Sequence, residues 1–340
     1  MPAAQSLQLG ARRPARIAAL TLLGRPALRS TQNILRGELL AKVARKLKSR
    51  PGWSNLDALL APAGLFRSDQ WYGHSPTLFR LLQADEEDFA DVARAAALRL
   101  QPSSPGCLVV VGVDSRRPGR GFRGDQMVVA FNSSGAIGLA RKSFPVDGDT
   151  NGWGRAPYLL FEQDGHDDRR FVTLPNGERA MLHACYDAFG LTELRIGPTH
   201  KRKAFRWAGD ENRWWRWFEP GETDRWFRRW AQAIDEHAPS VNLVSVHGFE
   251  RPGGEVYWQR HGIATASAAL GGALTVGAAH YAEFLPEGWS SPLASRGVKP
   301  RHLFEQCHRR ARTLAAVDHF YVALRARPSL YALVRLFQGA

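Results

Sequence analysis

The sequence predicts an α/β fold in which helices cover the outer faces of a β core. Three observations point to this class. Apolar runs typical of strands alternate with helical patterns along the chain, and two of these runs are joined by a tight turn into a hairpin. A length of 340 residues with 44% hydrophobic residues is enough to enclose a sizeable core. One large domain or two smaller ones would both fit this length.

The first half of the chain contains two predicted helices, at 33–47 and 85–100. Each carries apolar residues on one face, and the second begins with acidic residues that suit the positive end of a helix dipole. Buried strands are expected at 16–23, 56–60 and 107–113. Residues 127–131 and 136–142 form the predicted hairpin, and the Asn-Ser-Ser-Gly sequence between them supplies its turn.

The second half continues the alternation. Strands are expected at 179–185, 241–246 and 273–278, and helices at 226–237 and 257–270. From Pro300 to about Pro328 an Arg-rich face recurs at helical spacing. We therefore expect a disordered tail at 1–14, a main domain at 15–299 and a C-terminal helical extension at 300–340.

The net charge and the cysteine content limit the kinds of binding partner and the cellular compartment that we expect. The formal charge of +14 fits nucleic acid, an anionic surface, an acidic substrate or simple solubility. Cys107, Cys185 and Cys307 are odd in number and lack metal-ligand spacing, which favours a reducing compartment without disulfides or a metal site. The longest uncharged stretch, 262–279, is too rich in Ala, Gly, Ser and Thr for a membrane span. We expect a cytoplasmic protein with no membrane segment.

The segment 179–190 carries the main chemical signal. Its apolar run starts after the turn at 174–178 and stops abruptly at Cys185, and the polar pair Tyr186-Asp187 leads into a Gly-containing loop. A thiol at the end of a buried strand can be presented to a pocket as a nucleophile. The alternative is that Cys185 is simply a small buried apolar residue, as free cysteines often are.

Lys142 gives the second chemical signal. It ends the strand of the predicted hairpin, and Ser143-Phe144-Pro145 then breaks away into a loop. A lysine at a strand end is commonly exposed to solvent. A buried ammonium beside a thiol would instead lower the thiol pKa and stabilise negative charge on a substrate oxygen.

Together these segments resemble the nitrilase, or carbon–nitrogen hydrolase, superfamily. The resemblance covers roughly residues 15–332. It rests on the opening strand, the hairpin that leads to Arg141-Lys142, the segment 177–187, the later helix and strand at 263–280, and the closing segment 325–331. It implies an α-β-β-α sandwich in a single large domain, a homodimer or larger homo-oligomer, and a Glu-Lys-Cys triad that hydrolyses amides, nitriles or carbamoyl groups through a thioester.

The resemblance also implies residue roles. Cys185 would be the nucleophile, and Lys142 would steady the tetrahedral oxyanion with help from the backbone N–H of Tyr186. The expected activity is hydrolysis of a small-molecule amide or nitrile, with no cofactor and no metal. The alternative is a catalytically inactive protein of this fold that binds a ligand or has a structural role.

The chain departs from the family at the general base. The family places a Glu after the second strand, in a Pro-Glu pair, and here the matching pair is Pro62-Ala63. A methyl group cannot transfer a proton, and losing a positioned acid/base group typically lowers a rate by about 10²- to 10⁴-fold. Three explanations remain open: an inactivated variant, a natural relative that binds ligands without hydrolysing them, or another carboxylate, such as Glu162, in place of the base.

Two further residues could contribute to the site. Glu162 lies between Lys142 and Cys185 and could support the lysine, although a surface carboxylate beside Asp164 and Asp167 is an equal alternative. His183 and Cys185 are two residues apart in a strand and could share a face. For His183, however, a hydrogen-bonded core histidine is the favoured interpretation.

The segment 198–230 has no counterpart in the resemblance. It holds six of the eleven tryptophans, interleaved with Lys and Arg. We expect a lid over the pocket mouth that sets substrate specificity, with Trp207, Trp214, Trp215 and Trp217 as its anchors. A dimer contact is one alternative, and nucleic-acid binding, which also uses stacked aromatic and basic residues, is a less favoured one.

Overall fold

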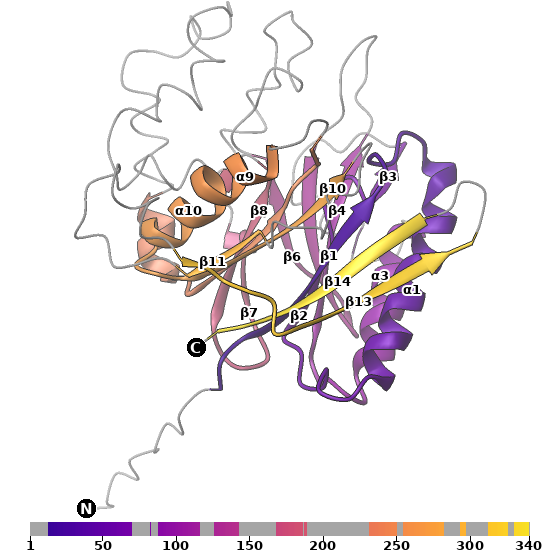
Figure 1. Ribbon diagram of the computed structural model, residues 1–340, viewed down its shortest axis with the longest axis horizontal. Helices are drawn as coiled ribbons and strands as arrows, with labels where there is room; N and C mark the ends of the chain where they lie inside the picture. The colour runs from indigo at the N-terminus through magenta and orange to yellow at the C-terminus, as the bar shows by residue number, and fades with distance from the viewer. Residues whose placement is uncertain are drawn as a thin grey trace, which may run out of the picture.

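The protein forms one α/β domain built on a large sheet with helices on its outer faces (Figure 1). The structure is a computed structural model, and it describes residues 13–69, 82, 88–115, 126–142, 168–185, 187–188, 231–249, 254–281, 293–296, 312–325 and 330–339. The fold class predicted from the sequence is therefore confirmed.

The elements follow the predicted alternation closely in the first half. The strands are β1 (Arg16–Leu23), β2 (Ala58–Leu60), β3 (Phe66–Ser68), β4 (Leu108–Ser115), β5 (Gln126–Asn132), β6 (Gly135–Arg141), β7 (Phe171–Thr173), β8 (Arg179–Ala184), β9 (Val241–Ser245), β10 (Leu274–Tyr281), β11 (Ala294–Arg296), β12 (Arg312–Thr313), β13 (Asp318–Leu324) and β14 (Leu330–Gln338). The helices are α1 (Asn33–Ser49), α3 (Asp88–Leu100), α9 (Gly254–Trp258) and α10 (Ala264–Ala269), with 3-10 turns η1 (Ser30–Gln32) and η2 (Asp168–Arg170), the π-helical turn η4 (Gln259–Ile263) and helical turns at 231–237.

The first half of the sheet has the order β6-β5-β4-β2-β1, and β14 and β13 continue it beyond β1. Alternation along β4 shows why these residues form a strand between two cores. Val109, Val111 and Val113 pack with the helices α1 and α3, whereas Leu108 and Val110 point to the opposite face. Helices α1 and α3 therefore cover one face of this half.

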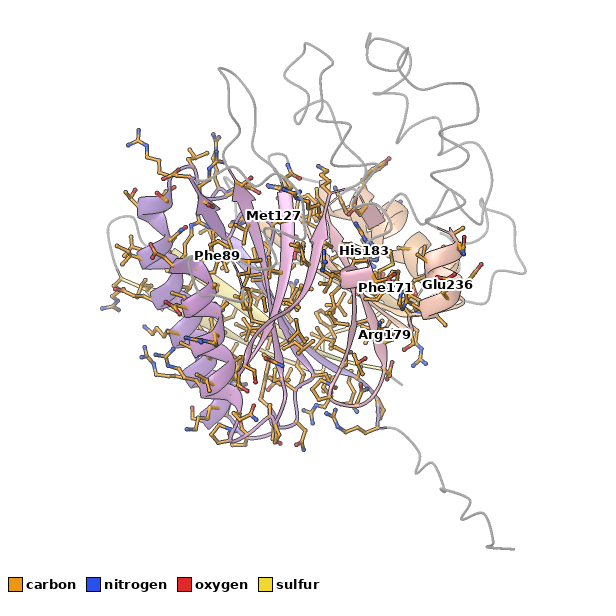
Figure 2. All side chains as sticks on the ribbon, turned by 180° about the vertical axis from the view of Figure 1, so that it is seen from behind. Phe89, Met127, Phe171, Arg179, His183 and Glu236 are labelled. Carbon is orange, nitrogen blue, oxygen red and sulfur yellow. The ribbon has the colours of Figure 1, made fainter. Side chains whose placement is uncertain are left out.

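The second half of the sheet has the order β10-β9-β8-β7. It joins the first half where β10 pairs with the end of β1, and its outer face packs against α9, α10 and the turns at 231–237. Leu182 of β8 and Leu243 of β9 point away from these helices into a core shared with the first half. Figure 2 labels Phe89 and Met127 in the cluster on the α1–α3 side and Phe171 in the cluster on the α9–α10 side.

Three hydrophobic clusters result, one between the two halves of the sheet and one under the helices of each outer face. Figure 1 shows α1 and α3 on one side of the strands and α9 and α10 on the other.

The carboxyl ends of six parallel strands meet at one edge of the domain, because β4, β2, β1, β10, β9 and β8 pair in parallel in that order. Two hydrogen bonds join the two halves there. Ser245 Oγ donates to the Ala61 carbonyl at 2.9 Å, and the Ala63 N–H donates to the Val246 carbonyl at 3.2 Å. Residues that directly follow these strands are therefore held close together, which is the usual place for a site in such sheets.

The predicted C-terminal helical extension is wrong for the residues that the structure describes. Residues 318–324 and 330–338 are strands, and β14 pairs antiparallel with β1 along its whole length. The physical reason is a two-residue period: Phe320 and Val322 are buried, whereas His319 and Tyr321 are exposed. This alternation outweighs the helical spacing of the arginines between Pro300 and Pro328. Of these, Arg301, Arg309, Arg310 and Arg327 lie outside the described residues.

No described helix combines the length and the apolar character needed to cross a membrane. Apart from residues 13 and 14, the predicted N-terminal tail lies outside the described residues.

Candidate active site

Cys185 lies at a sharp turn between a strand and a helical turn. It follows the last residue of β8, Ala184, and residues 187–188 are helical. Its φ of 51° is in the left-handed region, which costs energy for a residue with a Cβ. The turn is fixed by two backbone bonds, since the Cys185 N–H donates to the Ser245 carbonyl at 2.7 Å and the Ala188 N–H donates to the Cys185 carbonyl at 3.3 Å. The side chain is 7% exposed.

Lys142 directly follows β6 and is buried, with 5% of its surface exposed. Its backbone N–H donates to the Gln126 carbonyl at 2.9 Å, which continues the hairpin ladder by one residue. Its ammonium lies close enough to Cys185 to lower the pKa of the thiol. The structure thus brings together the two residues that the sequence singled out.

Arg170, on the turn η2, clamps the strands that lead to these two residues. Its Nη2 donates to the Arg141 carbonyl at 2.9 Å and its Nη1 to the Leu182 carbonyl at 3.4 Å. The same Nη1 forms an ion pair at 3.4 Å with Asp187, whose carboxylate also accepts from the Ala184 N–H at 3.3 Å. Both charged side chains are fully buried. The clamp fixes the carboxyl ends of β6 and β8, and with them the ammonium and the thiol.

His247, two residues beyond β9, adds a group that the sequence analysis did not identify. Its Nε2 lies 2.8 and 3.0 Å from the two carboxylate oxygens of Asp114 on β4. Burial would lower the pKa of His247, but the carboxylate of Asp114 and the thiol of Cys185 raise it more strongly, to about 10. The imidazole is therefore held as a cation against a carboxylate at neutral pH.

The pKa of the Cys185 thiol is lowered in net. Burial alone would raise it, but the Lys142 ammonium and the hydrogen bonding and charge of His247 lower it by more. Since Asp114 holds Nε2, Nδ1 is the ring nitrogen of His247 left to interact with the thiol. Nδ1 is buried and forms no hydrogen bond of normal geometry to the described residues. Such contacts often tighten only when a substrate is bound.

Ala63 is buried beyond the end of β2 and cannot transfer a proton. A carboxylate nevertheless lies beside it, since a Cβ added to Gly64 would come to 3.0 Å from Asp114 Oδ2. The backbone here is tightly packed: a Cβ on Gly112 would lie 2.2 Å from the Cα of Ala63. A carboxylate from β4 thus lies close to the point where the resemblance places a glutamate after β2.

Asp114 also faces a second cation. Burial lowers the pKa of Arg36 to about 10 against the opposing effect of the Asp114 carboxylate. Arg36 Nη2 donates to the Arg25 carbonyl at 2.6 Å. His280 lies on the same side, and its pKa is well below its ordinary value because of burial and the charges of Arg36 and His247. The side chain of Asp114 therefore faces both His247 and Arg36, with the neutral His280 close by.

His183 has a structural role in this arrangement. It is fully buried, and its Nε2 lies 3.0 Å from Asn242 Oδ1, while the Asn242 amide donates to Thr275 Oγ1 at 2.9 Å. Burial, together with the charge of Arg170, lowers the pKa of His183 to about 3. It is the hydrogen-bonded core histidine that the sequence favours, and Figure 2 labels it within β8.

Six other predicted site residues lie outside the described residues. They are Tyr186, Glu162, Trp207, Trp214, Trp215 and Trp217. The expected oxyanion N–H, the supporting glutamate and the lid therefore stay predictions.

The donor set does not suggest a metal. In the part of the chain that the structure describes, no group of three or more His, Cys, Asp or Glu side chains could hold an ion. The chemistry available here is instead that of an activated thiol, an imidazole and a fixed ammonium.

Asp114, Arg170 and His247 were missed by sequence reasoning, although a signal existed for two of them. Asp114 ends the β run that starts at 107, and His247 follows the predicted strand 241–246. Polar residues at the carboxyl ends of parallel strands converge, so a search of strand ends would have found both. Arg170 had no such signal, because nothing in its local sequence distinguishes it from Arg169.

No protein-family model matches this chain, and neither does any curated protein sequence. Among solved structures, the chain is similar to a carbon–nitrogen hydrolase from Helicobacter pylori G27, with 14% identity, coverage of 94% of this chain and 89% of that one, and a TM-score of 0.45. It is also similar to XC1258 from Xanthomonas campestris, a CN-hydrolase superfamily protein with an arsenic adduct in its active site (13% identity, 78% and 76% coverage, TM-score 0.44).

A third similar structure is an amidase from Nesterenkonia sp. (16% identity, 79% and 77% coverage, TM-score 0.39). At these identities and TM-scores the likeness says nothing about individual residues of this chain. By their names, these three solved structures are a carbon–nitrogen hydrolase, a CN-hydrolase superfamily protein and an amidase.

Proposed function

We propose that this protein is a carbon–nitrogen hydrolase that cleaves a small amide or nitrile through a thioester on Cys185. The observation that carries the proposal is the buried Cys185 thiol at a strained strand end, with its pKa lowered by the Lys142 ammonium and His247. A structural cysteine in an apolar core would have a raised pKa. The Lys142 ammonium beside the Cys185 thiol favours the thiolate, which is the nucleophilic form.

The reaction on an amide follows from the positions of these groups. The Cys185 thiolate attacks the carbonyl carbon, a C–S bond forms, and the carbonyl electron pair moves onto oxygen. The buried ammonium of Lys142 stabilises that oxyanion, and the backbone N–H of Tyr186 is its expected second donor. Collapse breaks the C–N bond, and the leaving nitrogen takes up a proton and departs as the amine. Water then attacks the thioester and gives up a proton that replaces the one consumed, and the acid and the Cys185 thiolate are released.

A second candidate function has one observation in its favour. Ala63 supplies no carboxylate where the resemblance places the general base, so the protein could bind a ligand at this site without turning it over. The two candidates differ in whether Cys185 becomes acylated.

A panel of aliphatic and aromatic amides and nitriles, assayed for ammonia release, tests the proposal. Intact-mass spectrometry after rapid acid quenching should show an acyl adduct, and peptide mapping should place it on Cys185. Lys142→Met should lower kcat by at least about 10²-fold, because it removes one oxyanion contact. The matched control Lys48→Met, at the end of α1, should leave kcat unchanged. Absence of both turnover and adduct across the panel would favour the ligand-binding function.

The remaining functional expectations rest on the sequence alone. We propose that the protein assembles as a homodimer or larger homo-oligomer and that the segment 198–230 closes over the substrate. Cytoplasmic location stays a prediction. Sedimentation and a deletion of 198–230, assayed against the same panel, would test the first two.

A further inference from the structure

We propose that His247, positioned by Asp114, is the general acid and base of this site and takes the role for which Ala63 has no side chain. The inference rests on the proposed hydrolase function for its reaction. In the resting enzyme, before any substrate binds, Cys185 and His247 would form a thiolate–imidazolium pair.

The geometry supports this pairing from three elements. Cys185 follows β8, His247 lies just beyond the neighbouring parallel strand β9, and Asp114 is the second-last residue of β4 in the other half of the sheet. Both carboxylate oxygens of Asp114 lie within 3.0 Å of His247 Nε2, so the ring orientation is fixed. Nδ1 is then the ring nitrogen left for the thiol, which interacts with the His247 side chain.

The charges around the imidazole keep the pair ionised. Asp114 and the thiolate of Cys185 favour the imidazolium, while Lys142 favours the thiolate. Arg36 is a second cation on the Asp114 side of the site. His280 is buried and neutral, so it adds no charge against the imidazolium. The positively charged side chains of Arg36, His247 and Lys142 thus alternate in space with two negatively charged ones, those of Asp114 and Cys185.

The other groups at the site are less suited to proton transfer. Lys142 is needed as a cation for the oxyanion, and a cation cannot act as a base. Both carboxylate oxygens of Asp114 face His247 Nε2, so the imidazole ring lies between this carboxylate and the thiol of Cys185. Asp114 is therefore a positioning residue, and His247 is the group to which the proposal assigns the proton transfer.

The proton balance closes with His247 alone. After the Cys185 thiolate has added to the carbonyl, the imidazolium gives its proton to the leaving nitrogen as the C–N bond breaks, and the amine leaves neutral. The neutral imidazole then takes a proton from water as its oxygen attacks the thioester. When the C–S bond breaks, the thiolate departs from the new acid, and thiolate and imidazolium face each other again.

Alkylation of Cys185 by iodoacetamide tests the resting pair without any substrate. The rate is measured by mass spectrometry from pH 5 to 9 in the full-length protein, with Cys185→Ala as the blank for the other two cysteines. Wild-type Cys185 should react at pH 6 within about threefold of its rate at pH 8, because the thiolate persists below its ordinary pKa. His247→Gln and Asp114→Asn should each slow the reaction at pH 6 by at least tenfold and shift the profile to higher pH.

Matched controls separate this effect from a general one. His319→Gln on the exposed face of β13 and Asp91→Asn on α3 make the same chemical changes away from the site and should leave the profile unchanged. Should His247→Gln melt below the assay temperature, Asp114→Asn, which keeps the shape of its side chain, provides the second variant. Its profile should shift in the same direction.

Turnover provides the second readout. On any amide that the wild type cleaves, His247→Gln should lower kcat by about 10²- to 10⁴-fold with little change in KM, and Asp114→Asn should lower it less and move the acid limb of the pH profile upward. An unchanged alkylation profile or unchanged kcat in His247→Gln would overturn the inference while leaving the hydrolase intact. A profile that depends on His247 in a protein that cleaves no amide or nitrile would instead support the pair and remove the proposed function.

Discussion

Two buried cysteines lie at opposite ends of the parallel strands, and their environments differ in the sign of the neighbouring charge. Cys107 precedes β4, and Cys185 follows β8. Burial and the nearby carboxylate of Asp57 raise the pKa of Cys107 far above its ordinary value. Burial also opposes ionisation of Cys185, but Lys142 and His247 lower its pKa in net. Burial alone therefore does not decide whether a thiol is reactive; the adjacent charges do.

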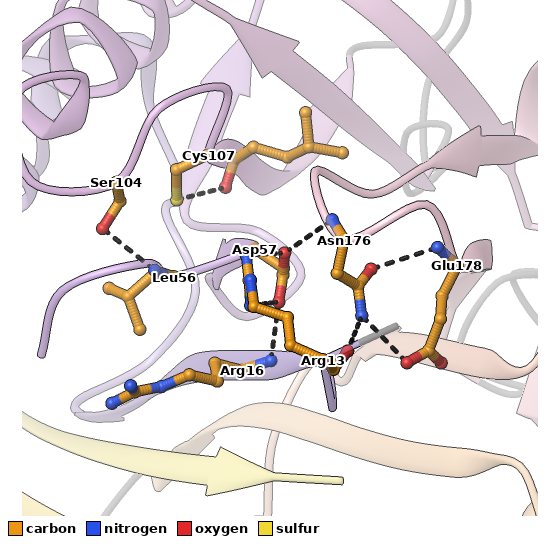
Figure 3. A network of polar contacts seen from close by, with 9 residues as sticks. Arg13, Arg16, Leu56, Asp57, Ser104, Cys107, Asn176 and Glu178 are labelled. Carbon is orange, nitrogen blue, oxygen red and sulfur yellow. Dashed lines mark hydrogen bonds and ion pairs between the residues drawn. The ribbon is translucent and has the colours of Figure 1, made fainter. Parts of the chain in front are cut away.

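The polar groups at the two ends differ in the same way. At the Cys107 end, Asp57 accepts two hydrogen bonds from the Arg13 guanidinium and others from the backbone N–H groups of Arg16 and Asn176 (Figure 3). The network ties β1, β2 and the turn before β8 together. Its carboxylate is saturated with donors, so it has no capacity left for chemistry.

At the Cys185 end, Nδ1 of His247 is buried and has no hydrogen bond of normal geometry to the described residues. Unpaired buried polar atoms are rare and costly in folded proteins, and functional sites are where they are tolerated. We infer that the polar groups at the Asp57 end stabilise the fold, whereas those at the Cys185 end are available to a substrate.

Replacing each of the two cysteines by alanine should give the largest difference in turnover between the two ends. Cys185→Ala should lower amide turnover by at least about 10⁴-fold, because it removes the atom that carries the acyl group. Cys107→Ala should leave kcat within about twofold. Ammonia release on the same panel measures both, and equal losses in the two variants would remove the contrast between the ends.

The second largest effect should come from breaking the buried ion pair. Arg170→Met leaves Asp187 buried without its cation and should lower the free energy of unfolding by about 3–5 kcal/mol. Arg13→Met at the other end should cost clearly less, because Arg13 is 39% exposed and the backbone donors of Asp57 remain. Urea unfolding measures both, and a larger loss for Arg13→Met would contradict this ranking.

Adding a carboxylate at position 63 sharpens the comparison further. Ala63→Glu would place a second buried carboxylate beside Asp114, and like charges at that distance disfavour ionisation of both. We expect turnover to fall at least about tenfold. A rise of tenfold or more would instead identify this chain as a Glu-Lys-Cys site that lacks its base, and the matched variant Ala63→Gln would then show no gain.

The smallest effect concerns acid stability. Because the pKa of His183 is lowered to about 3 in the folded chain, the unfolded chain binds a proton below about pH 6.5 that the folded chain does not. The free energy of unfolding should therefore fall as the pH decreases from about 6.5 to about 3, and His183 should account for about 1 kcal/mol per pH unit. Urea unfolding of wild type and His183→Gln at pH 7, 6, 5 and 4 checks the slope. Parallel slopes in the two proteins would show that His183 is not the cause.

Local sequence predicted a large part of the fold because each element carries its own periodicity. The apolar run at 16–23 coincides with β1, and the hairpin is formed by β5 and β6 within one residue at each end. The C-terminal segment was missed because two periods compete there. Pairing of β14 with the central strand β1, a contact more than 300 residues apart in sequence, decides in favour of strands.

What the sequence determined by itself is the alternation of strands and helices, and the presence of a thiol and an ammonium each at a strand end. Only the tertiary structure decided which charged groups surround that thiol. Asp114 and His247 are 133 residues apart and lie in different halves of the sheet. Their contact depends on the order in which strands pair, and that order is set by packing across the whole core rather than by any local pattern.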